Sequence, residues 1–216
     1  MQRENWIWLV LLTLAVCWRV PAAQLEGVFD RLFDLYDSST ARELTGHFRL
    51  EARLLRLENP DGLLGSGSRC DTVGPCDPVI SAYIDYETAS AVAGTPEAPD
   101  YITYTPVLEV RDENSPVINK VLSRDTCGRT IKKVLVRVHV VDHDRLSSED
   151  LLDDFGCHVK MDQEPAGNME LAEWSRELYC LPKSGLQKLR LSWKYRFFRV
   201  DPEDCRTMLS ATLAQA

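Results

Sequence analysis

Apolar side chains recur at every second position in several segments from Gly46 onward. This period matches the alternation of side chains between the two faces of a β-strand. Strands are therefore predicted at 46–54, 79–86, 104–110, 131–141, 155–161 and 189–200. Turn residues separate several of these segments, as in Asn59-Pro60-Asp61-Gly62. Strands at such intervals predict an antiparallel β-sandwich.

The first 23 residues have the pattern of a signal peptide. Arg3 precedes the apolar stretch 6–18, and the small residues Ala22 and Ala23 follow it. Because a membrane span needs roughly 20 apolar residues, we expect residues 1–23 to be cleaved and the protein to be secreted and extracellular. The alternative is a signal anchor that stays in the membrane.

Residues 24–45 predict an amphipathic helix ahead of the sandwich. Apolar residues recur there at helical spacing, namely Leu25, Val28, Phe29, Leu32, Phe33, Leu35 and Tyr36. We expect this stripe to pack on its own domain or on a partner; insertion into a membrane is the alternative. The sandwich is expected over 46–200, with a C-terminal tail at 201–216 and a short helix or helical loop at 171–179.

Six cysteines remain once the expected signal peptide is removed: Cys70, Cys76, Cys127, Cys157, Cys180 and Cys205. An even number in an exported chain predicts disulfides. The paired Cys-x-x-Cys spacing of a zinc site does not occur. Cys70 and Cys76 could bridge across a short loop, and the sequence leaves the other pairings open.

The chain is acidic, with 33 Asp and Glu against 25 Lys and Arg and a net charge of −8. Such a chain is a poor candidate for binding a phosphate backbone, so no nucleic-acid partner is expected. The acidic residues suit a cation if they converge in space.

Two loops carry aspartates close together. The first loop, 70–78, precedes an expected strand, and the second, 142–150, follows the expected strand with the most regular alternation. The aspartates of interest are Asp71, Asp77, Asp142, Asp144 and Asp150. Calcium binds six to eight hard oxygens, many of them from carboxylates. The two loops therefore predict a calcium site, with ordinary turn aspartates as the alternative.

The two aspartate loops also resemble a known family. Residues 71–83 resemble the first calcium loop of C2 domains, and 142–150 resembles their third loop at every acidic position. Trp174, Leu178, Gly185 and the segment 189–195 resemble the end of that fold. The resemblance spans 46–199 and implies an all-β, antiparallel, eight-stranded C2-type sandwich, preceded here by the amphipathic helix.

The C2 resemblance also implies a ligand and a partner. Its bound ion would be Ca²⁺, held by the five aspartates named above and a backbone carbonyl of Ser147. Bound calcium in that family attracts anionic phospholipid headgroups, while residues at the loop tips contact the membrane. Val73, Arg145 and Leu146 stand at those tips. The implied function is that of a secreted, calcium-dependent phospholipid-binding module.

A narrower resemblance is to the N-terminal C2-type module of Notch ligands of the Delta and Jagged kind. Its motifs are 46–52, 59–64 with Cys70 downstream, and 105–108. The Delta/Serrate module and epidermal-growth-factor-like repeats of those ligands do not follow in this sequence. This resemblance implies the alternative function of a protein–protein interaction module with an extracellular receptor as partner, in which calcium only braces the loops.

The sequence does not favour an enzyme. His139 lies in an expected strand and His143 in the second aspartate loop, and neither has a Ser or Cys with the spacing of a catalytic triad. A Gly-rich phosphate loop does not occur either. No residue is therefore predicted to be catalytic.

Overall fold

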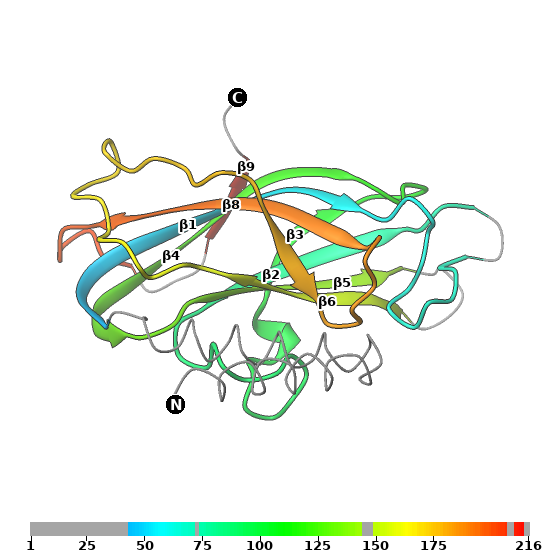
Figure 1. Ribbon diagram of the computed structural model, residues 1–216, viewed down its shortest axis with the longest axis horizontal. Helices are drawn as coiled ribbons and strands as arrows, with labels where there is room; N and C mark the ends of the chain where they lie inside the picture. Colours follow the sequence, from blue (N-terminus) through cyan, green and yellow to red (C-terminus); the bar gives the residue numbers. More distant parts are fainter. Residues whose placement is uncertain (1–42, 72–73, 144–148, 207–209, 214–216) are drawn as a thin grey trace, which may run out of the picture. The chain divides into compact units, whose positions relative to one another are not determined.

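The computed structural model describes residues 43–71, 74–143, 149–206 and 210–213 (Figure 1). The expected signal peptide and residues 24–42 of the expected helix lie outside these ranges. The last two residues of the expected helix, Leu44 and Thr45, belong to a β-strand, so the helix does not extend to 45. The described residues belong to the compact unit Arg42–Ala216. In this part of the chain, no helix has the length and apolar character needed to cross a membrane.

The described residues form nine β-strands and one short 3-10 helix. They are β1 (Leu44–Glu58), β2 (Pro78–Asp85), η1 (Tyr101–Thr103), β3 (Thr105–Glu109), β4 (Val117–Ile131), β5 (Leu135–Asp142), β6 (Asp150–His158), β7 (Leu178–Pro182), β8 (Arg190–Arg199) and β9 (Ser210–Leu213). The strand order is β3-β2-β5-β6-β7-β8-β1-β4-β9, and every pairing between these strands is antiparallel.

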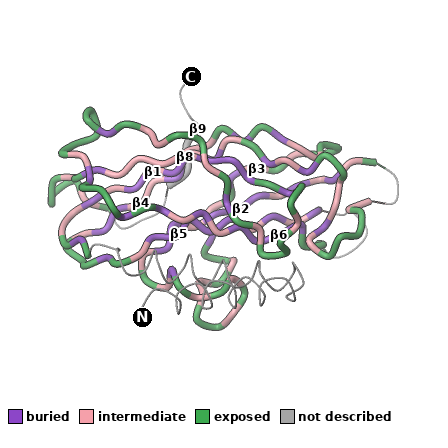
Figure 2. Tube along the Cα trace, viewed as in Figure 1, coloured by how far each residue is buried: buried purple, intermediate pink, exposed green. Residues whose placement is uncertain are grey.

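The strands form two layers that share β7. The first half of β7 pairs with β8, and its second half pairs with β6. One layer is therefore β3-β2-β5-β6, and the other is β8-β1-β4-β9 (Figure 1). The buried parts of the chain lie between these layers (Figure 2). This arrangement is an antiparallel β-sandwich.

The alternation in the sequence decides which side chains fill the core. In β1 the side chains of Phe48, Leu50, Ala52 and Leu54 are at most 1% exposed, while the residues between them are partly exposed. Trp193 of β8 is 1% exposed and contributes a large buried side chain. Since the hydrophobic effect gives roughly 25 cal/mol per Å² of buried apolar surface, these inward rows hold the two layers together.

The all-β, antiparallel fold class is confirmed, and β1 to β8 agree in number with the eight-stranded sandwich that the C2 resemblance implied; six of them lie at or near the segments expected from the alternation. The short strand β9 is an addition that lies within the expected tail 201–216. The expected strand 131–141 is in fact the end of β4 and most of β5, which are separated by a turn at 132–134. Most of β4 was not predicted, because its apolar alternation is weak.

The prediction of a helix or helical loop at 171–179 is wrong. Residues 172–177 have no regular secondary structure, and β7 begins at Leu178. The amide of Ser175 donates a hydrogen bond of 2.8 Å to the carbonyl of Tyr195, and the Ser175 hydroxyl accepts one of 3.1 Å from the Tyr195 amide. These bonds fasten the segment along β8, which satisfies its main chain without a helix.

Three disulfides are present: Cys70–Cys76, Cys127–Cys205 and Cys157–Cys180. The local bridge that the sequence allowed is therefore formed. The other two join β4 to the segment after β8, and β6 to β7. Three disulfides suggest an oxidising compartment.

A buried carboxylate fastens the long β2–β3 connection to the sandwich. Asp154 of β6 is 4% exposed and accepts hydrogen bonds of 2.8 Å from Tyr101 and, at Oδ1, from the ring of His139. Lys183 lies 3.4 Å from the same carboxylate and donates to the Ala93 carbonyl at 3.0 Å. The ring of Tyr101 stacks on His139 with 3.8 Å between centroids. His139 is thus engaged in holding the structure together.

The Asp154 network gives a pH-dependent stability prediction. Burial alone would raise the pKa of Asp154, but the hydrogen bonds from His139 and Tyr101 outweigh it and lower that pKa below its usual 3.8. The resulting stability is complete above about pH 4 and is lost as the pH falls through the folded-state pKa.

We therefore expect Asp154→Asn to lower the free energy of unfolding by about 1–3 kcal/mol at pH 7, and by less at pH 3. Urea denaturation at the two pH values measures this difference, with the exposed Asp162→Asn as control. An equal loss at both pH values would contradict the assignment.

Candidate metal site

Strand pairing brings the two aspartate loops together. Pro78 at the start of β2 pairs with Asp142 at the end of β5, and Asp142 pairs on its other side with Asp150 at the start of β6. Val79 pairs with Glu109 at the end of β3, so the β3–β4 connection leaves from the same place. We call this the loop end of the sandwich; it carries the connections 59–77, 110–116 and 143–149.

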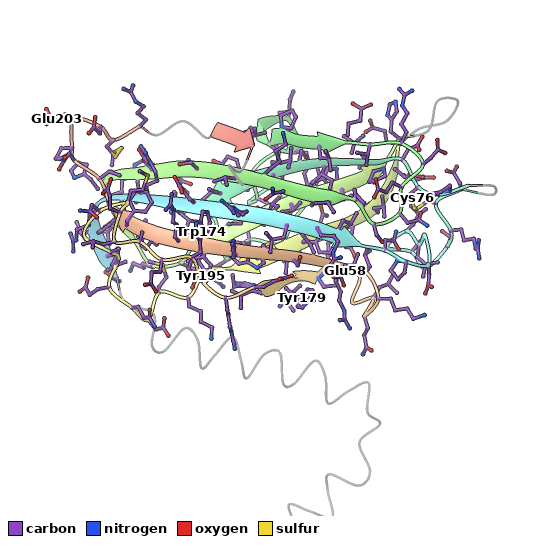
Figure 3. All side chains as sticks on the ribbon, turned by 90° about the horizontal axis from the view of Figure 1, so that it is seen from above. Glu58, Cys76, Trp174, Tyr179, Tyr195 and Glu203 are labelled. Atoms are coloured by element: carbon purple, nitrogen blue, oxygen red, sulfur yellow. A yellow bond between two sulfur atoms is a disulfide. The ribbon has the colours of Figure 1, made fainter. Side chains whose placement is uncertain are left out.

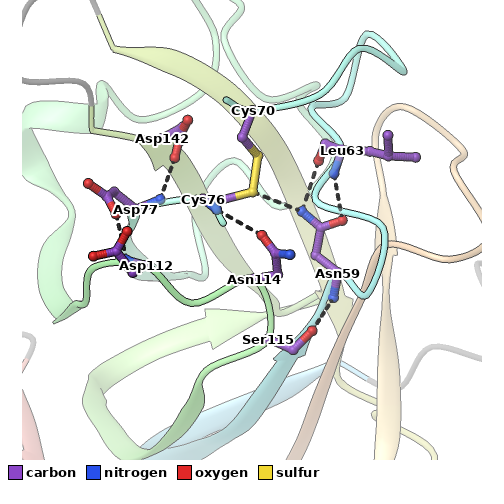
Figure 4. The surroundings of a disulfide bond; sticks show 9 residues. All are labelled: Asn59, Leu63, Cys70, Cys76, Asp77, Asp112, Asn114, Ser115 and Asp142. Atoms are coloured by element: carbon purple, nitrogen blue, oxygen red, sulfur yellow. Dashed lines mark hydrogen bonds between the residues drawn. A yellow bond between two sulfur atoms is a disulfide. The ribbon is translucent and has the colours of Figure 1, made fainter. Parts of the chain in front are cut away.

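A chain of hydrogen bonds ties these three connections to one another. The carboxylate of Asp142, which is fully buried, accepts a bond of 2.6 Å from the amide of Asp77. The carboxylate of Asp77 accepts a bond of 2.6 Å from the amide of Asp112, and its carbonyl accepts one of 3.0 Å from the amide of His143. Figure 4 shows Asp142, Asp77 and Asp112 in this order. One aspartate therefore links all three connections.

The disulfide Cys70–Cys76 holds the first loop in shape (Figure 4). The amide of Cys76 donates a bond of 2.7 Å to the side-chain carbonyl of Asn114 in the β3–β4 connection. The side chain of Asn59, which is 2% exposed, exchanges hydrogen bonds of 2.9 Å with the main chain of Leu63. The main-chain amide of Asn59 donates a bond of 2.9 Å to the Ser115 hydroxyl. The loop end is thus cross-linked by covalent and polar contacts.

The structure brings together several of the predicted residues. Asp77 is half-buried, Asp142 is buried and Asp150 is exposed, and all three lie at the loop end. Asp71 is half-buried and adjoins Cys70, whose sulfur lies within 4.8 Å of a carboxylate oxygen of Asp142. The remaining predicted residues, Val73, Asp144, Arg145, Leu146 and Ser147, lie outside the described residues.

The donor atoms at the loop end suit calcium better than zinc. Among the described residues, the one group of three His, Cys, Asp or Glu ligand atoms within 4.8 Å of one another is Cys70, Cys76 and Asp142. Its two sulfurs form a disulfide and are not thiolates, so they cannot hold zinc as ligands. What remains of this group is the carboxylate of Asp142, and carboxylate oxygens are ligands that Ca²⁺ prefers.

Sequence reasoning missed the contribution of the β3–β4 connection. Asp112 is exposed, has a left-handed backbone with φ of 54°, and donates its amide to Asp77. Asn and Asp adopt this conformation more readily than other non-Gly residues. The polar run Asp112-Glu113-Asn114 between two strands was the available signal. Nothing in the sequence indicated that Asn59 joins two loops.

Comparison with known proteins defines the class to which this sandwich belongs. No protein-family model matches the sequence, and no curated protein sequence matches it. The crystal structure of a C2 domain protein from Ramazzottius varieornatus is 30% identical, with a TM-score of 0.73, and the match covers 77% of this chain and 97% of that one. This chain therefore belongs to the C2 domain family.

Two further solved structures match this chain at lower identity. Human GIVD cytosolic phospholipase A2 is 12% identical with a TM-score of 0.48, and the match covers 73% of this chain and 17% of that one. A Drosophila C2-DSL-EGF1 structure is 16% identical with a TM-score of 0.40, and the match covers 70% of this chain and 67% of that one.

The burial of Asp142 gives a prediction that does not involve metal. Asp142→Ala removes the acceptor for the Asp77 amide at a fully buried position. We expect the variant to lose about 1–3 kcal/mol of unfolding free energy in the presence of a chelator. Asp150→Ala, which alters an exposed side chain at the same end, should change stability by less than about 0.5 kcal/mol. Chemical denaturation measures the free energy of unfolding of both variants. Similar losses of unfolding free energy would contradict the structural role assigned to Asp142.

Proposed function

We propose that this C2 domain is a secreted module that binds Ca²⁺ at the loop end and, with the ion bound, attaches to anionic phospholipid surfaces. The observation that supports this most is the hydrogen-bonded link from Asp142 through Asp77 to Asp112, which gathers acidic residues from three connections. The proposed function is binding, not catalysis.

Electrostatics explain why such an end would take up a divalent cation. Two carboxylates about 4 Å apart repel by roughly 4 kcal/mol at an effective dielectric constant of about 20. A calcium ion reverses the sign of this interaction and supplies positive charge toward a phosphate headgroup. We propose Asp71, Asp77, Asp144 and Asp150 as ligands, with Ser147 contributing its carbonyl. Asp142, the fifth expected ligand, is fully buried, and its carboxylate accepts the hydrogen bond from the Asp77 amide.

Two further contributions complete the proposal. Asp112 is an additional ligand candidate, because its carboxylate belongs to the connection that is bonded to Asp77. Val73 and Leu146 would enter the interface between headgroups and acyl chains, with Arg145 contacting phosphates. Burying two such apolar side chains contributes roughly 3–5 kcal/mol. Membrane attachment would therefore be reversible.

The protein-interaction alternative has no specific structural observation in its favour. It rests on sequence motifs shared with Notch ligands, and the Drosophila structure that contains such a module has a TM-score of only 0.40 with this chain. We therefore keep an extracellular receptor as an outcome to be tested and not as the proposed partner.

A calorimetric calcium titration tests the metal proposal. We expect a dissociation constant of about 10⁻⁴–10⁻³ M, as in other extracellular modules. Replacing both Asp77 and Asp150 with Asn should abolish the binding heat. Asp201→Asn with Glu203→Gln is the matched control. Both acids are exposed, and Glu203 lies at the opposite end of the sandwich from Cys76 (Figure 3). Retained calcium binding in the Asp77/Asp150 variant would refute the site.

Co-sedimentation with vesicles tests the lipid proposal separately. Vesicles that contain phosphatidylserine should bind the protein in calcium and release it in chelator, while vesicles of phosphatidylcholine alone should bind it weakly in both. Equal binding with and without calcium would exclude calcium bridging. Calcium binding without vesicle binding would leave a metal-braced scaffold and would reject the membrane function.

A further inference from the structure

The two central strands of one layer are strongly basic in a chain that is acidic overall. Strand β8 contains four Lys or Arg residues and no acid, and β1 contains three Arg and two Glu. Together they carry seven positive and two negative charges, a net +5, whereas the whole chain carries −8. Charge segregated in this way marks a surface that attracts the opposite sign.

The basic side chains lie on the outer surface of the sandwich. In β8 the residues Leu191 and Trp193 belong to the core, so Arg190, Lys194 and Arg196 at the alternate positions point away from it. Neighbouring strand β1 places Arg53 opposite Lys194. We call this outer surface the cationic face. It is defined by Arg53, Arg56, Arg190, Lys194 and Arg196.

Only part of this charge is neutralised. Arg196 pairs with Glu51 at 2.6 Å, and Arg56 pairs with Glu58 at 3.2 Å. Among the described residues, no acid forms an ion pair with Arg53, Arg190 or Lys194. Within the described ranges these three cations therefore have no ion-paired acid, although Glu58 lies opposite Arg190 in the β1–β8 ladder.

Aromatic rings hold these cations in position. The indole of Trp174 lies 4.7 Å from the guanidinium of Arg53, 4.9 Å from that of Arg196 and 5.5 Å from the ammonium of Lys194. Arg190 lies 5.7 Å from the ring of Tyr179. Figure 3 shows Trp174 on this layer. Cation–π contacts offset part of the repulsion between like charges and reduce the freedom that the side chains would lose on binding an anion.

The shape of the cationic face is a narrow strip. Arg190 and Arg196 are six residues apart on one strand, so the strip is about 20 Å long. It is two strands wide, with roughly 5 Å between the strand axes. On the β4 side, the residues paired with Arg53, Arg56 and Glu51 are the uncharged Val121, Val117 and Ser123. A strip of this form matches a chain that carries negative charges along its length.

We propose that the cationic face binds a linear sulfated polysaccharide. The sulfate groups would occupy the positions left by the missing counter-charges at Arg53, Arg190 and Lys194. The three disulfides favour this class of polyanion over nucleic acid, because they suggest an oxidising compartment. The width of the strip favours a single chain over a planar bilayer. This binding does not depend on calcium and is separate from the proposed membrane function.

Affinity measurements with a heparin-derived octasaccharide in the presence of chelator test the proposal. We expect binding that weakens steeply as salt is raised, because each occupied cation releases counter-ions. Replacing Arg190 and Lys194 with Ala should weaken the affinity at least about tenfold and reduce the salt dependence. Arg53→Lys keeps the charge and should retain most of the affinity.

The matched control replaces Lys132 and Lys133 with Ala. It removes the same charge from the β4–β5 turn, away from the cationic face, and should leave the affinity within about twofold. Equal losses in the control and the Arg190/Lys194 variant would show a non-specific charge effect and overturn the proposal. Circular dichroism and thermal melting confirm that each variant is folded.

Binding measurements with two other polyanions, phosphatidylserine vesicles and duplex DNA, determine which class of ligand the cationic face binds. Phosphatidylserine vesicles in chelator should not bind; binding that is lost in the Arg190/Lys194 variant would assign the face to a membrane and reject the polysaccharide. If duplex DNA binds as tightly as the octasaccharide, the polysaccharide proposal is also rejected. Because all these experiments contain chelator, their failure leaves the calcium proposal untouched.

Discussion

The hydrogen bond from the amide of Asp77 to the buried carboxylate of Asp142 organises the end of the sandwich on which the proposed function depends. It forms where β2 meets β5, so the first and third connections cannot separate without breaking it. The carboxylate of Asp77 then reaches the second connection at Asp112. A hydrogen bond to a buried carboxylate is costly to leave unmade. The geometry of the loop end is therefore set by the fold itself before any ion is considered.

Much of the fold was predictable because the strongest strands alternate cleanly. The buried rows of β1, β5 and β8 were visible in the sequence, and the aspartates that follow β5 carried the resemblance to C2 domains. Strand β4 was harder, because Asp125 and Thr126 are buried in it and its basic residues interrupt the period. Asp125 is held by Arg49 from β1, a contact between residues 76 positions apart. Local patterns do not contain that kind of information.

The residues of the site could be predicted from the sequence, but the role of each residue could not. Spacing identified Asp142 as an acid near other acids; only the folded chain shows that it is fully buried and bonded to a neighbouring amide. The same limit applies to Asn59, whose main-chain amide donates to the side chain of Ser115, and to Asn114, whose side chain accepts from the amide of Cys76. Trp174 was noted for its place near the end of the fold, whereas its contact with three cations depends on a segment that lies along β8 without being a helix.

Strand β7 belongs to both layers, since it pairs with β8 at its start and with β6 at its end. The sandwich is consequently one continuous hydrogen-bonded ribbon that is folded over at this strand. Cys180 of β7 is bonded to Cys157 of β6, so the crossing point is also covalently fastened. Neither layer can unfold as an independent unit. Unfolding that starts in one layer must spread to the other. We expect both layers of such a domain to unfold together under mechanical load, and to become accessible to a protease together.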